Sequence, residues 1–236
     1  VVCETTGTIG NEQFGMLLPI DYVANLARAE LGEVLVPGED EESDDMLRQR
    51  FYEAVNEPAF GGNVADYKQK VNEIAGVGAT KVYPVWNGGG TVKCTIIAAD
   101  WEPPSSALVN DVQTIIDPIV NSGQGLGQAP IGHVVTIAGV TGVTINIETT
   151  LLLSENVTPG HVQADIEMLM DAYLLELRQD WQNQVQIIVR IAQIDARMLT
   201  AQGVEDVSNT KINGIAANLT LSADDIPMLG TVTIND

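Results

Sequence analysis

The sequence predicts an α+β fold, built from two helix-plus-hairpin modules with mainly antiparallel sheets and preceded by the end of a β-rich segment. Apolar residues recur at helical spacing in several stretches, and pairs of extended runs separate these stretches. Asn87-Gly88 lies between two such runs, 80–86 and 91–98, and an Asn-Gly turn in that position is a strong hairpin signal. Because helices alternate with pairs of strands, a wholly parallel sheet is not expected.

Length and composition favour an ordered protein with one or two main domains. The 236 residues are 45% apolar, far from the low hydrophobicity that is typical of disordered chains. Changes in composition predict three parts: the end of a β-rich upstream domain at 1–37, a central α+β domain at 38–153 and a C-terminal α+β domain at 154–236. The chain begins at Val1 without an initiator Met or a signal-peptide pattern, and we interpret it as a fragment or processed product of a longer protein.

The charge of the chain limits the classes of partner. Its 11 Lys and Arg against 32 Asp and Glu give a net charge of −21. Nucleic acid and anionic membranes are therefore not expected as partners, because their electrostatic attraction would be reversed in sign. No apolar run approaches the roughly 20 residues of a membrane-spanning helix. The two cysteines do not form a disulfide framework, and Cys94 alternates with apolar residues as a small core side chain does.

The first module begins with turns and ends in paired strands. Glycines and short apolar runs before residue 38 indicate strands and turns. Ser43 is the expected N-cap of a first helix with Asp44 and Asp45 in its first turn, and Pro58 with Gly61-Gly62 is expected to end it. Asn63 is expected to cap a second helix that ends at Gly76. The apolar face of that second helix is predicted to consist of Val64, Tyr67, Val71 and Ile74.

A third helix and a second hairpin are expected next. Pro104-Ser105 introduces the helix, whose predicted inward residues are Leu108, Val112, Ile115 and Ile116. A strand at 132–140, a turn at Thr141-Gly142 and a strand from Val143 onward are expected to form the hairpin.

The C-terminal module repeats the order of helix and strand. Thr158-Pro159 opens the longest helix, as an N-cap followed by proline at the first helical position. A shorter helix ends at Gly203, and the remainder predicts strands at 204–212, 217–221 and 230–234, with a turn at Asn213-Gly214. The stripe expected to face the core of the long helix is Val162, Ile166, Leu169, Tyr173, Leu174 and Leu177. For the shorter helix it is Ile191, Ile194, Met198 and Leu199.

The sequence contains no set of residues with the spacing of a catalytic, cofactor or metal site. Six carboxylates lie within 39–45, but the Gly and Glu positions of a calcium-binding loop are missing, so a solvated helix start or a protein contact is favoured. His133 and His161 have no partner at metal-ligand spacing and are interpreted as structural. The glycine-rich stretch 123–127 lacks a lysine and precedes a strand, so it is interpreted as a connection. We expect no enzyme activity, no cofactor and no small-molecule substrate.

An ordered series of short motifs carries a resemblance to a known family. GEDEESDDMLRQR at 38–50 contains its most specific part, and GTIGN at 7–11 precedes it. The series resembles the baseplate J-like family of contractile phage tails over nearly the whole chain. Pro37-Gly38 replaces a Gly-Gly found in many members, and a further N-terminal region usual in the family is not seen ahead of GTIGN. The motif residues, which are also candidates for an assembly contact, are Glu42, Ser43, Asp44, Arg48, Arg50, Gly61, Gly62, Asp66, Tyr67, Gly76, Val77, Gly203 and Val204.

The resemblance implies a structural protein of the baseplate wedge in a phage, prophage or tail-like bacteriocin. Such proteins assemble with copies of themselves and with other wedge proteins around the tail hub, and their rearrangement helps to trigger sheath contraction. The expected location is therefore the virion tail, with assembly in the cytoplasm of the bacterial host. Two alternatives remain: a cell-wall or polysaccharide hydrolase that uses two carboxylates, and a cation-binding adhesion module.

Overall fold

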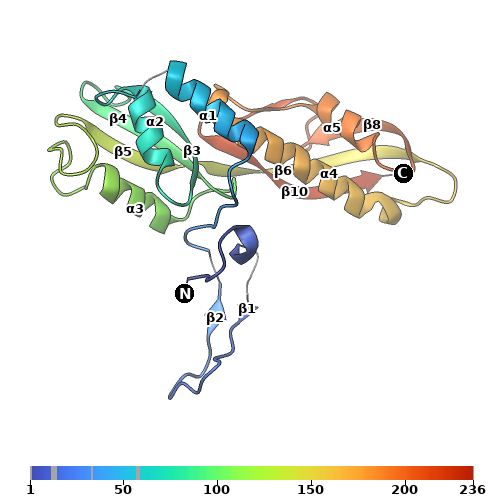
Figure 1. Ribbon diagram of the computed structural model, residues 1–236. Helices are drawn as coiled ribbons and strands as arrows, with labels where there is room; N and C mark the ends of the chain where they lie inside the picture. Colours follow the sequence, from blue (N-terminus) through green and yellow to red (C-terminus); the bar gives the residue numbers. More distant parts are fainter. Residues whose placement is uncertain (1, 12–14, 33, 57–58, 236) are drawn as a thin grey trace. The chain divides into compact units, whose positions relative to one another are not determined.

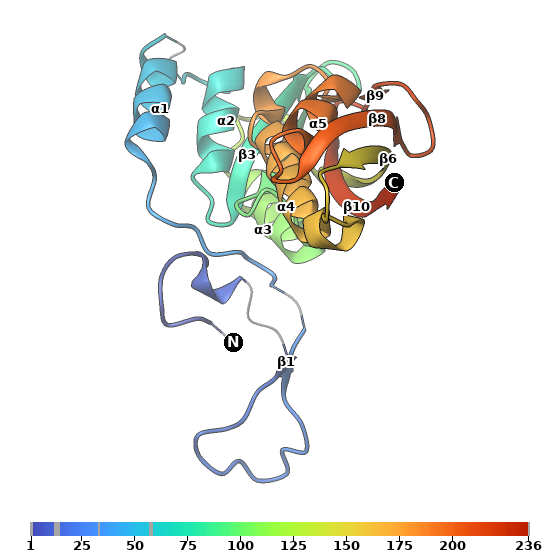
Figure 2. The ribbon, with the colours of Figure 1, turned by 90° about the vertical axis from the view of Figure 1, so that its right-hand side faces the viewer.

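The chain folds into two compact units, Val1–Gly139 and Val140–Asp236. The structure is a computed structural model that describes residues 2–11, 15–32, 34–56 and 59–235. It is a mixed α+β fold with mainly antiparallel strand pairs (Figures 1 and 2), which confirms the predicted fold class. No helix in the described ranges is long and apolar enough to cross a bilayer.

The first unit begins with a short 3-10 turn and a narrow two-stranded arm. The turn is η1 (Thr8–Gly10), and the arm consists of β1 (Gly15–Met16) and β2 (Glu30–Leu31), which pair antiparallel through two residue pairs. A long loop connects the two strands (Figure 1). The expected β-rich segment is thus represented, among the described residues, by these two short strands.

Helix α1 (Asp44–Asn56) begins where the sequence predicts. The Ser43 hydroxyl accepts a hydrogen bond from the Met46 N–H at 3.3 Å, and Asp44 and Asp45 occupy the first turn, where carboxylates favour the positive end of the helix dipole. Pro58, the predicted stop, lies outside the described residues.

A three-stranded sheet with two helices forms the body of the first unit. The sheet order is β3 (Val77–Pro84), β4 (Thr91–Ala98) and β5 (Val134–Gly139). The β3–β4 pair is the predicted antiparallel hairpin, with Val82 opposite Cys94. Strands β4 and β5 run parallel, because α3 (Ser106–Ile116) lies between them and reverses the chain. This pair is the part of the sheet that the sequence pattern did not predict.

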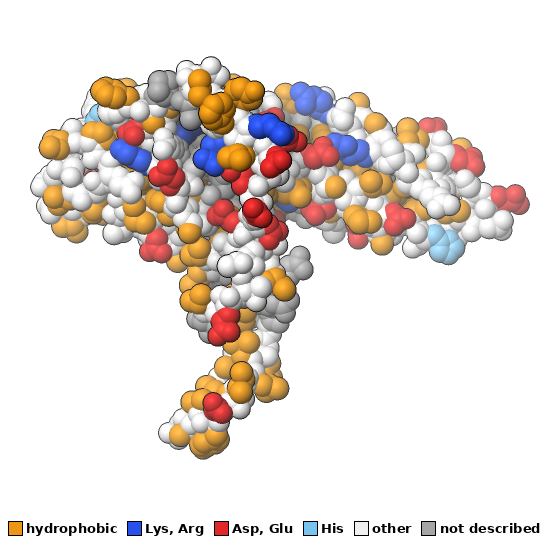
Figure 3. Space-filling model, viewed as in Figure 1, with side chains coloured by type: hydrophobic (Ala, Val, Ile, Leu, Met, Phe, Trp, Pro, Cys, Tyr) orange, Lys and Arg blue, Asp and Glu red, His pale blue; other side chains and the backbone are white. Residues whose placement is uncertain are grey.

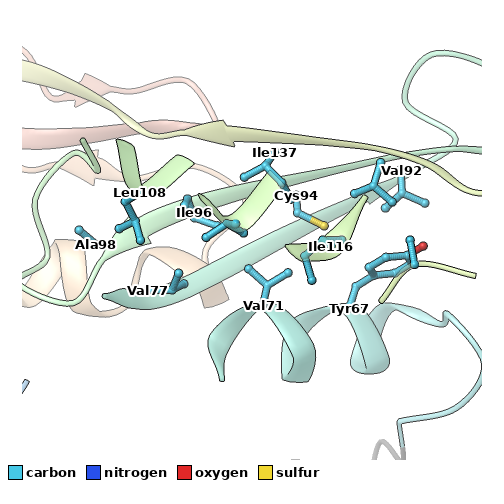
Figure 4. Close-up of a cluster of buried hydrophobic side chains, with 13 residues drawn as sticks. Tyr67, Val71, Val77, Val92, Cys94, Ile96, Ala98, Leu108, Ile116 and Ile137 are labelled. Carbon is cyan, nitrogen blue, oxygen red and sulfur yellow. The ribbon is translucent and has the colours of Figure 1, made fainter. Parts of the chain in front are cut away.

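The core of this unit lies between the sheet and the two helices α2 (Val64–Asn72) and α3 (Figure 4). Ile115 is 40% exposed, so it does not belong to the inward face of α3, and Gln113 is buried instead. Helix α2 ends at Asn72 with Glu73 as its C-cap, and Gly76 forms the turn that follows. The buried cluster consists of Tyr67, Val71, Val77, Val92, Cys94, Ile96, Ala98, Leu108, Val112, Ile116, Ala129, Val135 and Ile137.

The second unit has a separate three-stranded sheet in the order β10-β6-β8. Strand β6 (Thr141–Leu153) lies in the centre, with β8 (Val204–Ile212) antiparallel on one side and β10 (Asp225–Asn235) parallel on the other. Helix α4 (Pro159–Gln179) packs against β10, and α5 (Ile191–Met198) packs against β8. Two short strands, β7 (Ile188–Val189) and β9 (Leu219–Thr220), pair antiparallel.

The predicted hairpin around Thr141-Gly142 is wrong. Strand β5 adds to β4 in the first unit, whereas β6 begins at Thr141 and pairs only in the second unit, with β8 and β10. The two compact units accordingly meet in sequence at Gly139–Val140, and not at 153/154 where the sequence placed the division. Alternation of apolar and polar residues predicts a strand, but it does not indicate which other strand it pairs with.

Two helical stripes of the second unit differ from prediction by one position. Met170 and Arg178 of α4 are buried, whereas Leu169 and Leu177 are only partly so. The buried Arg178 donates from Nη1 to the Pro227 carbonyl at 3.1 Å. In α5, Ile194 and Met198 are buried, but Leu199 is 46% exposed.

Candidate assembly surface

The acidic stretch 39–45 contacts two other parts of the first unit. Glu39 Oε1 accepts from the Gly76 N–H at 3.1 Å, and the Asp40 carboxylate accepts from the N–H and the hydroxyl of Thr8, each at 2.9 Å. Just before the stretch, the Asn11 side chain exchanges two hydrogen bonds with the backbone of Gly38, at 2.8 and 2.9 Å. The carboxylate of Asp40 therefore holds the GTIGN turn against the acidic stretch, and that of Glu39 attaches the stretch to the turn before β3.

Arg48 and Arg50 of the motif form ion pairs with carboxylates at the same helix start. Arg50 donates from Nε and Nη2 to the Glu42 carboxylate at 3.0 and 2.8 Å, and Arg48 lies 2.8 Å from Asp45. The hydrogen bond from Arg50 lowers the pKa of Glu42, and the reciprocal bond raises the pKa of Arg50. The side chains of Arg48, Asp45 and Arg50 are largely exposed to solvent and that of Glu42 is about one-third exposed (34%), so each pair contributes little to stability.

Helix α1 exposes apolar side chains that a folded core would normally cover. Leu47, Phe51 and Val55 follow one another at i, i+4 spacing and are 47, 62 and 62% exposed. Met46 and Tyr52 beside them are 52 and 62% exposed. Figure 3 shows hydrophobic side chains gathered over this helix. We call Leu47, Phe51 and Val55 the α1 stripe.

The pair Gly61-Gly62 shapes the entry to α2. Both glycines have positive φ, 55° and 86°, and a Cβ on Gly62 would come within 2.6 Å of Pro130. The Gly62 N–H donates to Asp66 Oδ2 at 2.8 Å, and the same oxygen accepts from Lys70 Nζ at 2.8 Å. The backbone freedom of glycine is needed here because the turn must approach the 130–133 loop closely.

Tyr67 is a core residue with one polar contact. It is 1% exposed, and its hydroxyl lies 2.8 Å from Nδ1 of His133, whose ring stacks with the Tyr67 ring at a centroid distance of 6.0 Å. Burial raises the pKa of Tyr67, with smaller contributions from Cys94 and nearby carboxylates. His133 thus contacts the buried face of α2 through Tyr67.

Gly76 and Val77 form the junction between the α2 turn and β3. Gly76 has φ +88°, and a Cβ there would lie 2.8 Å from Val36 and 3.3 Å from Leu108. Val77 is 3% exposed and belongs to the buried cluster. The motif residues of this segment therefore hold the packing of the first unit.

Gly203 and Val204 play a similar part in the second unit. Gly203 has φ +92° and lies against Val157, and its carbonyl accepts from the Ser154 N–H at 2.9 Å. Val204 opens β8 opposite Leu153. Thr158, close by, is the N-cap of α4, as the sequence predicts. Nδ1 of His161 accepts a hydrogen bond from the Thr158 N–H at 3.2 Å.

Two features of the first unit were not predicted from the sequence. One is the arm, whose loop carries a series of exposed apolar side chains. The other is a buried polar network, in which the Asp117 carboxylate accepts from the backbone N–H groups of Gly123 and Val135 at 3.0 and 2.9 Å. An apolar run between charged residues could have indicated the arm, whereas nothing in the sequence marks Asp117 or Gln113 as buried.

No cluster of metal-ligating side chains is found in the described part of the chain. Groups of three or more His, Cys, Asp or Glu in a geometry that could hold a metal ion are absent from residues 2–11, 15–32, 34–56 and 59–235. The carboxylates of the acidic stretch that have described partners accept from backbone N–H groups, from Thr8 or from arginines.

Comparison with known proteins identifies the family. The Baseplate J-like central domain matches residues 59–139, and the Baseplate J-like protein C-terminal domain matches 145–235. The chain belongs to the baseplate J-like family. The two matches coincide closely with the sheet-containing parts of the two compact units. This member of the family is a baseplate protein of a phage or prophage tail.

Named relatives of this baseplate J-like chain come from a bacterium and a phage. It is 40% identical to the uncharacterized protein YqbT and 37% identical to the phage-like element PBSX protein XkdT, both of Bacillus subtilis strain 168, over 98 and 99% of its length. It spans 65 and 66% of those two relatives. It is also 42% identical to the baseplate protein gp47 of Escherichia phage Mu over 60 residues, which cover 25% of this chain and 17% of gp47.

A solved structure shares the fold. A chain of the anti-feeding prophage baseplate superposes with a TM-score of 0.54 at 10% identity, covering 95% of this chain and 50% of the other. The likeness at this identity supports the fold alone, and the family assignment rests on the sequence matches.

Proposed function

We propose that the chain is a structural component of the baseplate wedge, which assembles with copies of itself and with other wedge proteins around the tail hub and takes part in triggering sheath contraction. The supporting observation is that two groups of residues in the first unit have different roles. The motif residues from Gly61 to Val77 hold the packing, while the α1 stripe and the arm present apolar side chains to solvent. Large exposed apolar surfaces mark sites of protein contact.

We also propose that the acidic stretch, with Arg48 and Arg50, borders a subunit contact. The two arginines already pair with carboxylates of their own helix start, so this contact would have to use the outer sides of those pairs. Reversing the charges of Asp44 and Arg48 should then impair particle assembly without unfolding the chain. Normal assembly of the reversed variant would leave the pairs with a local role only.

No observation favours a carboxylate-dependent hydrolase over this role. Two hollows of the second unit, each of about 470 to 480 Å³, contain one carboxylate apiece, Glu148 in the first and Asp165 in the second. A glycosidase needs two carboxyl groups facing one another across the scissile bond. Electron microscopy of tails from a strain that lacks the gene separates the two functions, because loss of a hydrolase would leave the tail structure complete.

Electron microscopy of tails tests the proposal directly. Deleting the gene from its phage or prophage should give tails without baseplates, and expression from a plasmid should restore them. Complete baseplates in the deletion strain would overturn the wedge assignment. Assembly in the host cytoplasm, which we also propose, predicts that baseplates are already present in lysates prepared before release.

A further inference from the structure

Strand β5 is a terminal strand of the first sheet, and its sequence lacks the features that usually protect a sheet edge. The strand Val134–Gly139 contains neither a charged residue nor a proline. A terminal strand without such residues can pair with a strand of another chain, because its outer backbone groups offer a ready template. The other terminal strands of the two three-stranded sheets do contain them, namely Lys81 and Pro84 in β3, Glu205, Asp206 and Lys211 in β8, and Asp225 and Pro227 in β10.

The outer edge of β5 is formed by the backbone groups of Val135 and Ile137. The Val134 N–H donates to the Gly90 carbonyl at 2.8 Å, so residue 134 directs its backbone groups towards β4. In a parallel pair, the next residue along the strand directs its N–H and carbonyl to the opposite edge. The N–H and carbonyl of Val135 and the N–H of Ile137 are therefore the groups that an added strand would use.

Two side chains occupy these three groups. Gln113 of α3 donates from Nε2 to the Val135 carbonyl at 2.9 Å, and its Oε1 accepts from the Ile137 N–H at 2.8 Å. Asp117, which follows the helix, accepts from the Val135 N–H through Oδ2 at 2.9 Å. We call Gln113 and Asp117 the edge plug.

The edge plug reproduces the hydrogen bonds of a fourth parallel strand. In a parallel sheet, one residue of an added strand would donate to the Val135 carbonyl and accept from the Ile137 N–H. The amide of Gln113 makes both of these bonds. The carboxylate of Asp117 takes the place of the preceding carbonyl of such a strand, which would accept from the Val135 N–H.

Further hydrogen bonds hold the edge plug in position. Gln113 is 9% exposed and Asp117 is 1% exposed. Gln113 Nε2 also donates to the Asp117 carbonyl at 2.6 Å, and the Asp117 carboxylate also accepts from the Gly123 N–H at 3.0 Å and from the Ser122 hydroxyl. Helix α3 itself packs along β5 (Figure 1). Because moving either side chain would leave buried polar atoms without partners, the edge plug is a fixed part of the fold.

We infer that the edge plug closes β5 to strand addition and so prevents the first sheets of two copies from joining edge to edge. The segment that it protects is prone to such pairing. Residues 134–147 contain no charged residue and no proline and are rich in Val, Ile and Thr, which is typical of segments that form intermolecular strands. The inference goes beyond the wedge role and does not depend on it, because it concerns the purified chain.

Gln113→Met tests the edge plug. Methionine has a similar length and shape, but it cannot replace the amide, so the Val135 carbonyl and the Ile137 N–H would become available to another strand. Each hydrogen bond gained on pairing contributes a factor of about five to association. We therefore expect self-association in sedimentation equilibrium to be at least about tenfold stronger than in the unmodified chain. Gln69→Met, the same substitution at an exposed position of α2, should leave it unchanged.

A second substitution shows whether the association uses the edge of β5. Val134 is 43% exposed, and a lysine on a terminal strand discourages pairing. The double variant Gln113→Met with Val134→Lys should therefore associate no more than the unmodified chain. Aggregation caused by partial unfolding would persist in the double variant, since the lysine does not restore the lost hydrogen bonds.

Three results would overturn the inference. The first is a Gln113→Met chain that unfolds cooperatively yet associates no more than Gln69→Met, which would limit the edge plug to attaching α3 to the sheet. The second is association that persists in the double variant. The third comes from hydrogen exchange of the unmodified chain and needs no variant to fold. A closed edge requires protection at Val135 and Ile137 within about tenfold of that at Ile96 in the central strand β4, and weaker protection would show an open edge.

Discussion

The carboxylate of Glu39 accepts a hydrogen bond from the backbone N–H of Gly76, 37 residues further along the chain, at 3.1 Å. The acceptor comes from the acidic motif and the donor from the turn before β3. Two parts of the family signature that are far apart in sequence therefore meet at one point. The bond attaches the segment that leads into α1 to the packed part of the first unit.

Glu39→Ala should loosen this attachment. A buried or half-buried hydrogen bond contributes about 1 kcal/mol net, so we expect a loss of that size in the free energy of unfolding, measured by chemical denaturation. Glu39→Gln keeps an oxygen acceptor and should cost less. Glu41→Ala, which removes a neighbouring exposed carboxylate, serves as the control. Equal effects of Glu39→Ala and Glu41→Ala would show that the bond does not contribute.

Gly76→Ala should destabilise the chain for two reasons. The residue has φ +88°, which side chains other than that of glycine rarely adopt, and the new Cβ would lie 2.8 Å from Val36 Cγ1. Together these predict a loss of about 2 to 4 kcal/mol, measured by denaturant unfolding. Gly89→Ala meets open space and an ordinary φ, so it should change stability little. Val36→Ala combined with Gly76→Ala should recover part of the loss, because it removes the clash but not the strain.

Removing the Arg50 side chain should change the titration of Glu42. The hydrogen bond from Arg50 holds the pKa of Glu42 below its ordinary value, so the pair is retained above the ordinary carboxyl pKa and is lost as the pH falls through the lowered one. In Arg50→Gln, carboxyl NMR should show the pKa of Glu42 rising towards that of a free glutamate. Arg48→Gln should leave it unchanged, since Arg48 pairs with Asp45. An unchanged Glu42 in Arg50→Gln would contradict the pairing.

The sequence predicted the local elements well because their signals are local. Ser43, Asn63 and Ser105 each accept a hydrogen bond at the helix start that they were expected to cap or introduce. The Asn87-Gly88 hairpin follows from turn chemistry within a few residues. In each case the residues that determine the structure lie next to one another in the chain.

The strand pairings could not be predicted in the same way. Strand β5 follows α3 and joins β4 in parallel, and β6 then finds β8 and β10 far along the chain. Alternation of apolar residues is the same for either partner, so pattern alone cannot choose between them. For the candidate surface, the helical structure could be predicted but the solvent exposure could not, for a related reason. The residues of the α1 stripe were recognised as helical, but their exposure depends on which elements pack nearby.

The alkaline stability of the chain should depend on Cys94. Burial raises the pKa of this thiol from 9.0 to about 12, so its contribution is complete below the unfolded-state pKa and is lost as the pH rises from about 9 towards 12. Between about pH 8 and about pH 10 this predicts a loss of about 1 to 2 kcal/mol in the free energy of unfolding. Cys94→Ala should remove that part of the pH dependence, whereas Cys3→Ser should not.

Asp117→Asn should disrupt the loop that follows α3. The Asp117 carboxylate is 1% exposed and accepts hydrogen bonds from the N–H groups of Gly123 and Val135 and from the Ser122 hydroxyl. An amide nitrogen cannot accept, so at least one buried donor would lose its partner, at a cost of about 1 to 3 kcal/mol. Faster hydrogen exchange at the Val135 N–H would locate the damage at the edge of β5. Asp111→Asn, on the exposed side of the same helix, should leave both stability and exchange unchanged, and an equal effect there would mean that the loss reflects charge alone.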